Sequence, residues 1–526
     1  MKTGLVKIER AIISVSNKGG LEKLALRLKS WDIELIASGG TAKALKEKSI
    51  EVIEVEDLTG FPEILEGRVK SLHPNIHGGI LAIRDNSRHI ADLKKNKILP
   101  IDLVICDLYP FEETVQKKES HVNCIENIDV GGITLIRAAA KNYRHITVIS
   151  NSAGYLDLLN HLDKNGGKTS SEFRLSKALD AFSCSSNYDQ QVVNWLYDSN
   201  SKLFPKEKGL TFKLNKILSY GENYHQNAAF YQHKNSKEQL PNFTQHQGKP
   251  LSYNNFLDLD SGVDLLQTFS NQIKPLIGII KHTNPCGVAS ADTVLEALDR
   301  SFQCDAISAF GGIVVSNTVI SPPVANKIME TFFEVIIAPA FQEDSLKVFS
   351  KKPNLRIISI GEDWKLNPRI IYELRSIYSG FLYQEKDYHE IEKKDLKIVT
   401  QTNPEPNELE DLLFAWKVVK QVKSNGIVFV KNEATVGIGS GQPSRLDSTI
   451  TAINKSDKLK VKHPLKGTAM ASDAFFPFAD SLKEAVSKGV KSVIQPGGSI
   501  RDKEVIDFAD KNGISMVFTG VRAFKH

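Results

Sequence analysis

Residues 11–28 read AIISVSNKGGLEKLALRL, and this stretch decides the expected fold of the first part of the chain. A β-branched apolar run comes first, a turn rich in small residues follows, and an amphipathic segment ends the stretch. The apolar face of that segment consists of Leu21, Leu24, Ala25 and Leu28. The pattern predicts a strand, a glycine turn and a helix, which together begin a βαβ unit.

The same alternation recurs along the first 200 residues. Short β-branched runs are separated by segments long enough for a helix, and one of these, GGITLIRAAAKN (131–142), has apolar residues at helical spacing. The runs are 11–15, 33–37, 52–55, 103–106 and 146–149. Strands that alternate with helices predict an α/β domain whose parallel sheet has helices on both faces.

The pattern weakens between residues 196 and 216, a charged segment that contains a proline and a glycine. We therefore predict a domain boundary near residue 200, which gives domains 1–199 and 200–526. The second domain again alternates β-rich runs, such as PLIGIIKH (275–282), with helices such as 408–420 and 481–488. Its strand–turn–helix elements resemble one another too weakly for the pattern alone to establish a repeat.

Length and charge set limits on the class of protein. At roughly 150 residues per domain, 526 residues suggest about three or four units. Lys and Arg number 67 and Asp and Glu 62, which leaves a net charge of only +5. This balance argues against a basic nucleic-acid coat, and 41% hydrophobic content argues against a mostly disordered chain.

Five scattered cysteines, an odd number, are typical of free thiols in a reducing compartment. The first 20 residues lack the apolar core of a signal peptide, and no apolar run approaches the ~18 residues that cross a bilayer. We expect a soluble cytoplasmic protein whose partners include neither a membrane nor a nucleic acid.

Two turns of small residues, SVSNKGG (14–20) and ASGGT (37–41), follow predicted strands and precede predicted helices. Backbone N–H groups at a helix start, together with Lys18 and hydroxyl groups, form a cradle suited to a phosphate. The alternative is that these residues serve only as turn and N-cap residues. Because both turns lie at the carboxyl edge of one predicted sheet, the two interpretations are about equally favoured.

Four later features also have a structural and a functional interpretation. Arg68 and Lys70 in GRVKSLHP (67–74) form either a solvated basic patch or a pair of cations on one side of an extended segment. Tyr109 is, by itself, more simply a core aromatic residue, Asp129 a helix cap, and Lys141 a charge that complements the helix dipole.

Taken in order, SVSNKGG, ASGGTAKAL, GRVKSLHP, LYPF, ENIDVGG and RAAAKN resemble the cyclohydrolase domain of the family of 5-aminoimidazole-4-carboxamide ribonucleotide (AICAR) formyltransferase/IMP cyclohydrolases. The resemblance implies a fold similar to methylglyoxal synthase (MGS) and the closure of formyl-AICAR to IMP. The implied catalytic residues are Lys70, Tyr109, Asp129 and Lys141. The implied nucleotide-binding residues are Ser16, Lys18, Ser38, Gly39, Gly40, Thr41, Arg68, Ser71, Cys106 and Asp107.

Ring closure requires groups that these residue types supply. An amide nitrogen is a poor nucleophile, so a base must remove its proton, and the developing oxyanion needs donors. One geometric problem stands out. Asp129 and Lys141 are 12 positions apart, and a continuous helix would separate them by ~18 Å, so they share a site only if the chain bends or the substrate bridges them.

In the second half, IIKHTNPCG (279–287) ends an apolar strand with Lys281 and His282, and we expect the following NPCG to form the turn. GIGSGQPSR (437–445) lacks the spacing and the acidic residue of a dinucleotide site. Cys286 has no second cysteine two residues further on and no preceding H-x-E, so a zinc deaminase site is also excluded.

The motifs SYGENYHQ, GKPLSYNN, IKHTNPCG, SAFGGIVVSN, EVIIAPAF, SNGIVFV, GIGSGQPSR, SDAFFPFAD and PGGSIRD resemble the formyltransferase domain of the same family. The resemblance implies a duplicated, zinc-free, cytidine-deaminase-like α/β fold, 10-formyltetrahydrofolate as co-substrate, no metal, and a homodimer. It implies catalysis by Lys281, His282 and Asn425. It also implies AICAR contacts by Tyr220, Gly311, Glu334, Arg445 and Arg522, and folate contacts by Leu446, Phe475, Ser499 and Ile500.

The sequence departs from the family pattern at several positions. Ser219 stands where an arginine is expected to meet the AICAR phosphate, and Tyr224 replaces a proline. Asn17 and Gly19 stand where Asp and Thr are common. The alternatives are a non-catalytic nucleotide sensor or scaffold, and an enzyme that retains ring closure only. A sensor would not need all of Lys70, Asp129, Lys141, Lys281, His282 and Asn425.

Overall fold

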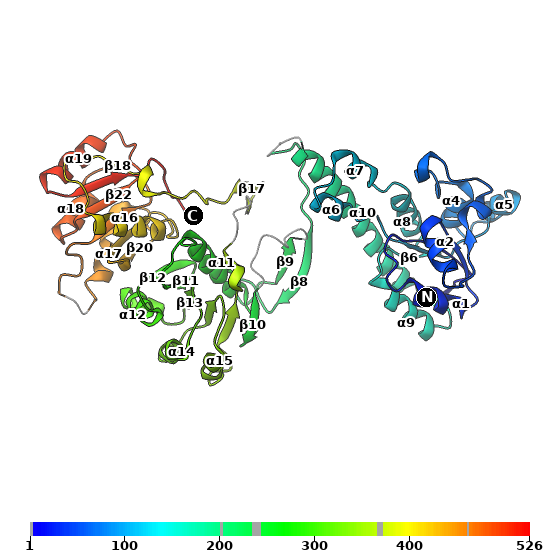
Figure 1. The fold of residues 1–526 in the computed structure, drawn as a ribbon, viewed down its shortest axis with the longest axis horizontal. Helices are drawn as coiled ribbons and strands as arrows, with labels where there is room; N and C mark the ends of the chain where they lie inside the picture. Colours follow the sequence, from blue (N-terminus) through cyan, green and yellow to red (C-terminus); the bar gives the residue numbers. More distant parts are fainter. Residues whose placement is uncertain (1–3, 200–203, 234–242, 366–371, 460–461) are drawn as a thin grey trace. The chain divides into compact units, whose positions relative to one another are not determined.

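The computed structural model describes residues 4–199, 204–233, 243–365, 372–459 and 462–526 (Figure 1). The chain divides into two compact units, Met1–Thr211 and Phe212–His526. The domain boundary predicted near residue 200 falls at 200–203, outside the described residues. No described helix is long and apolar enough to cross a membrane.

The first unit contains a five-stranded parallel sheet with the order β4-β3-β2-β5-β6. Its strands are β2 (Arg10–Ser14), β3 (Glu34–Ala37), β4 (Ile53–Glu54), β5 (Leu103–Cys106) and β6 (Thr147–Ile149). Each of the five β-branched runs overlaps one of these strands. The predicted parallel α/β architecture is therefore confirmed. A short antiparallel pair, β1 (Val6–Lys7) and β7 (Lys168–Thr169), lies outside this sheet.

Helices cover both faces of this sheet, because each face has its own apolar core. On one face α1, α2 and α9 bury their apolar sides, and the α1 residues are the four predicted from the sequence. On the other face α4, α8 and α10 do so. The helices are α1 (Leu21–Lys29), α2 (Gly39–Lys46), α3 (Val55–Thr59), α4 (Pro74–Leu81), α5 (Ser87–Lys95), α6 (Phe111–Gln116), α7 (His121–Glu126), α8 (Gly131–Lys141), α9 (Gly154–Lys164) and α10 (Ser171–Ser199).

The second unit is built on a twelve-stranded sheet with the order β10-β15-β14-β13-β11-β12-β20-β19-β21-β22-β23-β18. Two hairpins stand apart from it, β8 (Phe212–Leu218) with β9 (Ala228–His233), and β16 (Tyr372–Ile377) with β17 (Gly380–Glu385). The β-rich runs predicted from the sequence coincide with strands of the large sheet. The second unit is thus α/β, as expected, whereas its cytidine-deaminase-like character stays a prediction.

The large sheet consists of two halves with the same order of elements. The first half is β10 (Thr244–Gln247), α11 (Tyr253–Thr268), β11 (Leu276–Lys281), β12 (Asn284–Ser290), α12 (Val294–Cys304), α13 (Ala306–Ala309), β13 (Ile313–Ser316), α14 (Pro322–Met329), β14 (Val335–Ala338), α15 (Glu343–Phe349) and β15 (Arg356–Ser359). The second half is β18 (Lys397–Ile398), α16 (Pro406–Val419), β19 (Ile427–Lys431), β20 (Ala434–Gly439), α17 (Arg445–Ser456), β21 (Ala469–Ser472), α18 (Asp480–Ser487), β22 (Ser492–Gln495), α19 (Asp502–Lys511) and β23 (Ser515–Phe518). Only the short α13 has no counterpart among the described helices.

In each half the first helix lies on one face of the sheet and the later helices lie on the other. Residues of α11 and α16 share a core that spans both halves. Residues of α12, α14 and α15 form a second core, and residues of α17, α18 and α19 form a third. The halves join where β12 pairs with β20 in antiparallel orientation.

A glycine in each half lets the helix after the hairpin approach the strand. A Cβ on Gly287 in β12 would lie 1.9 Å from Ser301 O of α12, and a Cβ on Gly437 in β20 would lie 2.4 Å from Ala452 O of α17. Ser301 and Ala452 are each the eighth residue of their helix. The same close backbone approach therefore occurs at equivalent places in the two halves.

The expected turn at NPCG is wrong. The turn between β11 and β12 consists of His282 and Thr283, and Asn284 already pairs with Lys281 across the hairpin. Pro285 lies within β12 beside a register shift in the ladder. A bulge of this kind accommodates a residue that has no N–H to donate.

Replacing Gly287 by alanine tests the close approach of α12 to β12. The added Cβ would meet a backbone carbonyl, which has to move. We expect the free energy of unfolding to fall by about 1–3 kcal/mol, as measured by chemical denaturation. The control is Asp292→Ala just after β12, where the side chain is 87% exposed, and the expected change is under about 0.5 kcal/mol. Equal stability of Gly287→Ala and the native chain would contradict this account.

Candidate active sites

The carboxyl ends of β2, β3 and β5 bring the two predicted phosphate turns together. Asp107, which follows β5, accepts hydrogen bonds from the N–H groups of Ser16 and Asn17, the latter at 3.2 Å. The hydroxyl groups of Ser14 and Ser38, at the ends of β2 and β3, lie 3.4 Å apart. One edge of the sheet therefore holds both turns, where ligands of parallel α/β sheets bind.

Lys18 of the first turn is held against the second turn. Its Nζ donates to Thr41 Oγ1 at 3.0 Å and also to Val15 O. Burial lowers the pKa of Lys18, and the Asp107 carboxylate opposes that shift. The ammonium group lies near the start of α2, where backbone N–H groups and the helix dipole favour an anion.

Lys70 and Ser71 reach the same edge. A Cβ on Gly39, whose φ is +42°, would overlap Lys70 Nζ, so the ammonium lies directly over the turn that begins α2. Lys70 Nζ is 2.5 Å from Glu63 Oε2. Ser71 Oγ would be 3.1 Å from a Cβ on Gly131, the first residue of α8. Small residues at two helix starts thus give space to these two side chains.

Asp129 joins the loop after β5 to the start of α8. Its Oδ2 accepts a hydrogen bond from Tyr109 N at 3.3 Å, and its Oδ1 accepts one from Gly132 N at 2.7 Å. Burial raises the pKa of Asp129, and the two hydrogen bonds oppose that shift. The Tyr109 side chain is 53% exposed, so its interpretation as a core aromatic residue is wrong. A carboxyl with a perturbed pKa beside an exposed phenol is suited to proton transfer.

Cys106 and Arg68 are less available to a ligand. Cys106 is buried, its Sγ donates to Gly132 O at 3.8 Å, and burial raises the pKa of its thiol well above the ordinary value. This cysteine is therefore a neutral thiol. Arg68 is exposed, and its guanidinium makes a two-pronged contact with Glu126, with Nε at 3.2 Å from Oε2.

Lys141 lies at the other end of α8 from Asp129. The helix runs without a break from Gly131 to Lys141, a rise of ~15 Å. Lys141 instead lines an open groove of 680 Å³ together with His73, His77 and Arg137. Because the chain does not bend, the structure does not bring Lys141 and Asp129 together within one chain.

In the second unit, the predicted residues Lys281 and His282 lie at the β11–β12 turn. Lys281 Nζ donates to Phe310 O at 2.8 Å, which occupies one of its three N–H groups. Asn284 donates from Nδ2 to His282 O at 3.2 Å and accepts at Oδ1 from Lys423 N at 3.0 Å. Asn284 therefore ties the turn that carries His282 to the segment that leads into β19.

Asn425 lies in that segment and is held on both sides of its amide. Its Nδ2 donates to Gln442 O at 2.9 Å and to Pro443 O at 3.0 Å, while its Oδ1 accepts from Arg445 Nη2 at 2.8 Å. Arg445 is itself buried, and its Nη1 contacts Asp473 Oδ1 at 2.5 Å. Both amide hydrogens of Asn425 and two nitrogens of Arg445 thus already have partners.

The other predicted AICAR residues lie on several elements. Glu334, before β14, accepts from Asn255 Nδ2 at 2.9 Å. Gly311 has a φ of +76°, and its N–H donates to Phe332 O at 2.8 Å. Tyr220 follows β8 and is 39% exposed. Arg522 is exposed near the C-terminus, with its guanidinium 4.8 Å from the ring centroid of Phe524.

The predicted folate residues lie after strands of the second half or in α17. Phe475 follows β21, Ser499 and Ile500 follow β22, and Leu446 lies in the first turn of α17. The Phe475 and Ile500 side chains are exposed, which is suited to contact with a flat, partly apolar ligand. Ser499 Oγ accepts from Arg501 N at 3.1 Å.

Three residues that organise these sites were missed by the sequence analysis: Asp258, Asn284 and Asp473. Asn284 was within a quoted motif, but it was assigned to a turn. Asp473 was within the quoted motif SDAFFPFAD, and Asp258 lies three residues after the motif GKPLSYNN. Neither a carboxylate that caps a turn, such as Asp258, nor one buried against an arginine, such as Asp473, has a periodicity that pattern analysis could find.

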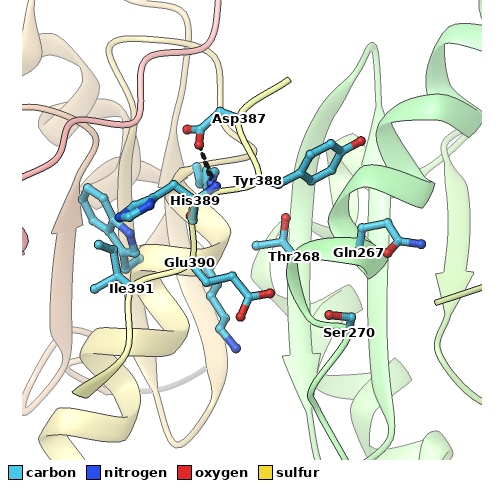
Figure 2. A pocket seen from close by; sticks show the side chains of 11 residues that line it. Gln267, Thr268, Ser270, Asp387, Tyr388, His389, Glu390 and Ile391 are labelled. Carbon is cyan, nitrogen blue, oxygen red and sulfur yellow. Dashed lines mark hydrogen bonds and ion pairs between the residues drawn. The ribbon is translucent and has the colours of Figure 1, made fainter. Parts of the chain in front are cut away.

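A separate small cavity of 80 Å³ lies between the ends of α11 and α16. Figure 2 shows the segment 387–391 across it, with Asp387 in an ion pair. Lys420 is the partner, and its Nζ donates to Asp387 Oδ1 at 3.0 Å and to His389 O at 2.7 Å. None of the predicted site residues lines this cavity, and ligand pockets are typically about 300–1,000 Å³. It is too small for a nucleotide or a folate.

Within the described ranges, no group of three or more His, Cys, Asp or Glu side chains is placed to hold a metal ion.

Similarity to known proteins extends along the whole chain. Residues 20–134 match the MGS-like domain, and residues 139–455 match the family described as AICARFT/IMPCHase bienzyme. Proteins named bifunctional purine biosynthesis protein PurH from Dinoroseobacter shibae and Ruegeria pomeroyi are each 46% identical over 530 residues, covering 100% of both chains. The protein of that name from Rhodospirillum rubrum is 46% identical over 524 residues and covers 99% of both chains.

The raised pKa of Asp129 predicts a pH-dependent effect of Asp129→Asn. A carboxyl with a raised pKa in the folded state contributes stability below its unfolded pKa of about 3.9 and loses it as pH rises through the folded pKa. Asp129→Asn has no carboxyl at this position and therefore does not lose stability in this way. We expect the melting temperature of the variant minus that of the native chain to be larger at pH 7 than at pH 4. Exposed Asp92→Asn is the control for the added amide. A difference that is constant or reversed with pH would contradict the account.

Proposed function

Because the chain belongs to the AICARFT/IMPCHase bienzyme family, we propose that its two units divide two consecutive reactions between them. The chain is a bifunctional enzyme of purine biosynthesis, an AICAR formyltransferase and an IMP cyclohydrolase, with 10-formyltetrahydrofolate as co-substrate. The observation that carries this conclusion is similarity to bifunctional relatives over the full length of the chain. We assign ring closure to residues 1–199 and formyl transfer to residues 200–526.

For ring closure, we assign the nucleotide phosphate to the turn 38–41, with Lys18 and Lys70 beside it. Both ammonium groups lie at the start of α2, whose N-terminus favours an anion. The reacting end of the substrate then lies toward Tyr109 and Asp129. The half-buried carboxyl of Asp129 is suited to accept the amide proton, and the exposed Tyr109 hydroxyl is suited to donate to the developing oxyanion.

For formyl transfer, we assign proton removal from the AICAR amine to His282, which occupies the tip of the β11–β12 turn. Lys281 has N–H groups left to stabilise negative charge on the formyl oxygen. Asn425 has both amide hydrogens engaged, so we assign it to positioning, through its contacts with Arg445 and with the Gln442 backbone. This differs from the catalytic role that the resemblance implies for Asn425.

We further propose a homodimer. The two hairpins outside the large sheet, β8–β9 and β16–β17, expose apolar side chains, which are typical of surfaces covered by another chain. The most exposed of these are Ile217, Tyr231, Tyr378, Phe381 and Leu382. A second copy would also provide an exposed Lys141 that could reach the Asp129 of its partner, which α8 prevents within one chain.

We place the enzyme in the cytoplasm. The five cysteines, all within the described residues, form no disulfide with one another, as expected in a reducing compartment.

Loss of formyl transfer alone is a second candidate, and the state of Arg445 favours it. Arg445 is one of the two arginines expected to contact AICAR, but it is buried against Asp473 and bound to Asn425. It therefore does not offer a free guanidinium to a phosphate. On this account the chain would retain ring closure and bind AICAR weakly.

Single substitutions should separate the two activities. We expect His282→Ala to lower the rate of formyl transfer from 10-formyltetrahydrofolate to AICAR strongly while leaving conversion of added formyl-AICAR to IMP unchanged. Lys70→Ala should do the reverse and allow formyl-AICAR to accumulate. Each loss should be about 100-fold or more, with both products measured by absorbance and chromatography. A single variant that eliminates both activities in folded protein would contradict the division of labour.

Ser219→Arg should tighten AICAR binding by restoring a two-pronged cation. A charge-assisted contact of this kind is worth about 1.5–3 kcal/mol, which corresponds to a roughly 10- to 100-fold lower Kd, measured by calorimetry. Ser219→Met, which adds length without charge, is the control. No tightening by arginine would mean that other residues already neutralise the phosphate.

A further inference from the structure

The two halves of the large sheet contain equivalent hairpin turns, and only one of them carries a histidine. His282 (φ 52°) and Thr283 (φ 63°) form the β11–β12 turn, and Asn432 (φ 51°) and Glu433 (φ 57°) form the β19–β20 turn. In both turns two non-glycine residues adopt the left-handed conformation, which L-amino acids disfavour. Each turn therefore needs other contacts to hold it.

A carboxylate at the same helical position supports each turn. Asp258 Oδ1 accepts a hydrogen bond from Thr283 N at 2.7 Å. Asp411 accepts from Asn432 N at 2.8 Å and from Glu433 N at 2.7 Å. Asp258 and Asp411 are each the sixth residue of their helix, α11 and α16. The support is thus a repeated feature of the fold.

The surroundings of the two turns differ. The β19–β20 turn is closed by its own neighbours, because Lys274 Nζ contacts Glu433 Oε2 at 3.1 Å and Arg300 donates to Asn432 O. At the β11–β12 turn, Asp258 binds the backbone of the turn that carries His282, and the side chain of His282 can act on a ligand. The same structural device therefore has a different consequence in each half.

We propose that Asp258 is a positioning residue for formyl transfer, which fixes the backbone of the His282–Thr283 turn and thereby aims the His282 imidazole at the AICAR amine. This inference rests on the proposed role of His282. Asp258 acts through the turn and does not need to touch the substrate. Proton transfer requires the base to lie within about 2.6–3.2 Å of the nitrogen whose proton it removes, so a small rotation of the turn affects the rate more than it affects binding.

The test compares Asp258→Ala with Asp411→Ala in the full-length chain. Both variants lose the same kind of support at equivalent turns, so we expect similar falls in melting temperature. Only Asp258→Ala should lower kcat for formyl transfer, by about 10- to 100-fold, with less than about threefold change in either KM. Asp411→Ala should keep kcat within about twofold of the native chain. Both should retain IMP cyclohydrolase activity, which depends on the other unit.

Asp258→Asn keeps the shape of the side chain and one acceptor oxygen, so it should fold and show an intermediate kcat. A double-mutant cycle then tests the route of the effect. In a His282→Ala background, Asp258→Ala should lower the residual rate by no more than about twofold, because the base that it positions is gone.

Three results would overturn the inference. These are a native kcat for Asp258→Ala, an equal loss of kcat in Asp411→Ala, and a loss that persists in full without His282. Native formyl transfer by His282→Ala would refute the proposed role of His282 itself, and with it the basis of the inference, whatever Asp258→Ala does.

Discussion

The pairing of β12 with β20 is the interaction on which the second unit depends. The Thr435 hydroxyl accepts a hydrogen bond from Val288 N at 2.9 Å and donates to Val288 O at 3.2 Å, and Ser290 N donates to Glu433 O at 2.9 Å. These bonds join two six-stranded halves into one sheet. They also bring the β11–β12 turn beside the segment before β19, so that Asn284 can bind Lys423 and place His282 near Asn425.

The repeated order of elements in the two halves explains why the sheet contains two equivalent turns, the reactive β11–β12 turn and the closed β19–β20 turn. The β11–β12 and β19–β20 hairpins each have a bulge, two left-handed turn residues and a capping aspartate. Side chains then distinguish the two turns. At the β19–β20 turn, Glu433 binds Lys274, and Arg300 donates to Asn432 O. The β11–β12 turn carries Lys281 and His282, which can act on a ligand. Function is thus added at the ends of strands, while the sheet itself is unchanged.

The strands of both units could be predicted from the sequence, because β-branched runs such as 103–106 are buried on both sides of a parallel sheet. The β11–β12 turn could not. Turns with two left-handed residues usually contain Asn or Gly, and His-Thr gives no such signal, whereas Pro285 wrongly indicated a turn. The contacts of Asp129 with two backbone N–H groups, and the distance of Lys141 from it, follow from where α8 begins and ends. Those limits depend on packing and not on local propensity.

The pairing of β12 with β20 in the middle of the large sheet also suggests how the two halves arose. Either half by itself would have an unpaired inner edge, β12 or β20, with free N–H and C=O groups that attract another strand. Two identical copies of such a half would meet edge to edge about a twofold axis, in the arrangement that the halves adopt here. Fusion of an ancestral gene to its own copy would make that association permanent. Each copy could then diverge, so that one half acquired a reactive turn and the other a turn closed by internal contacts.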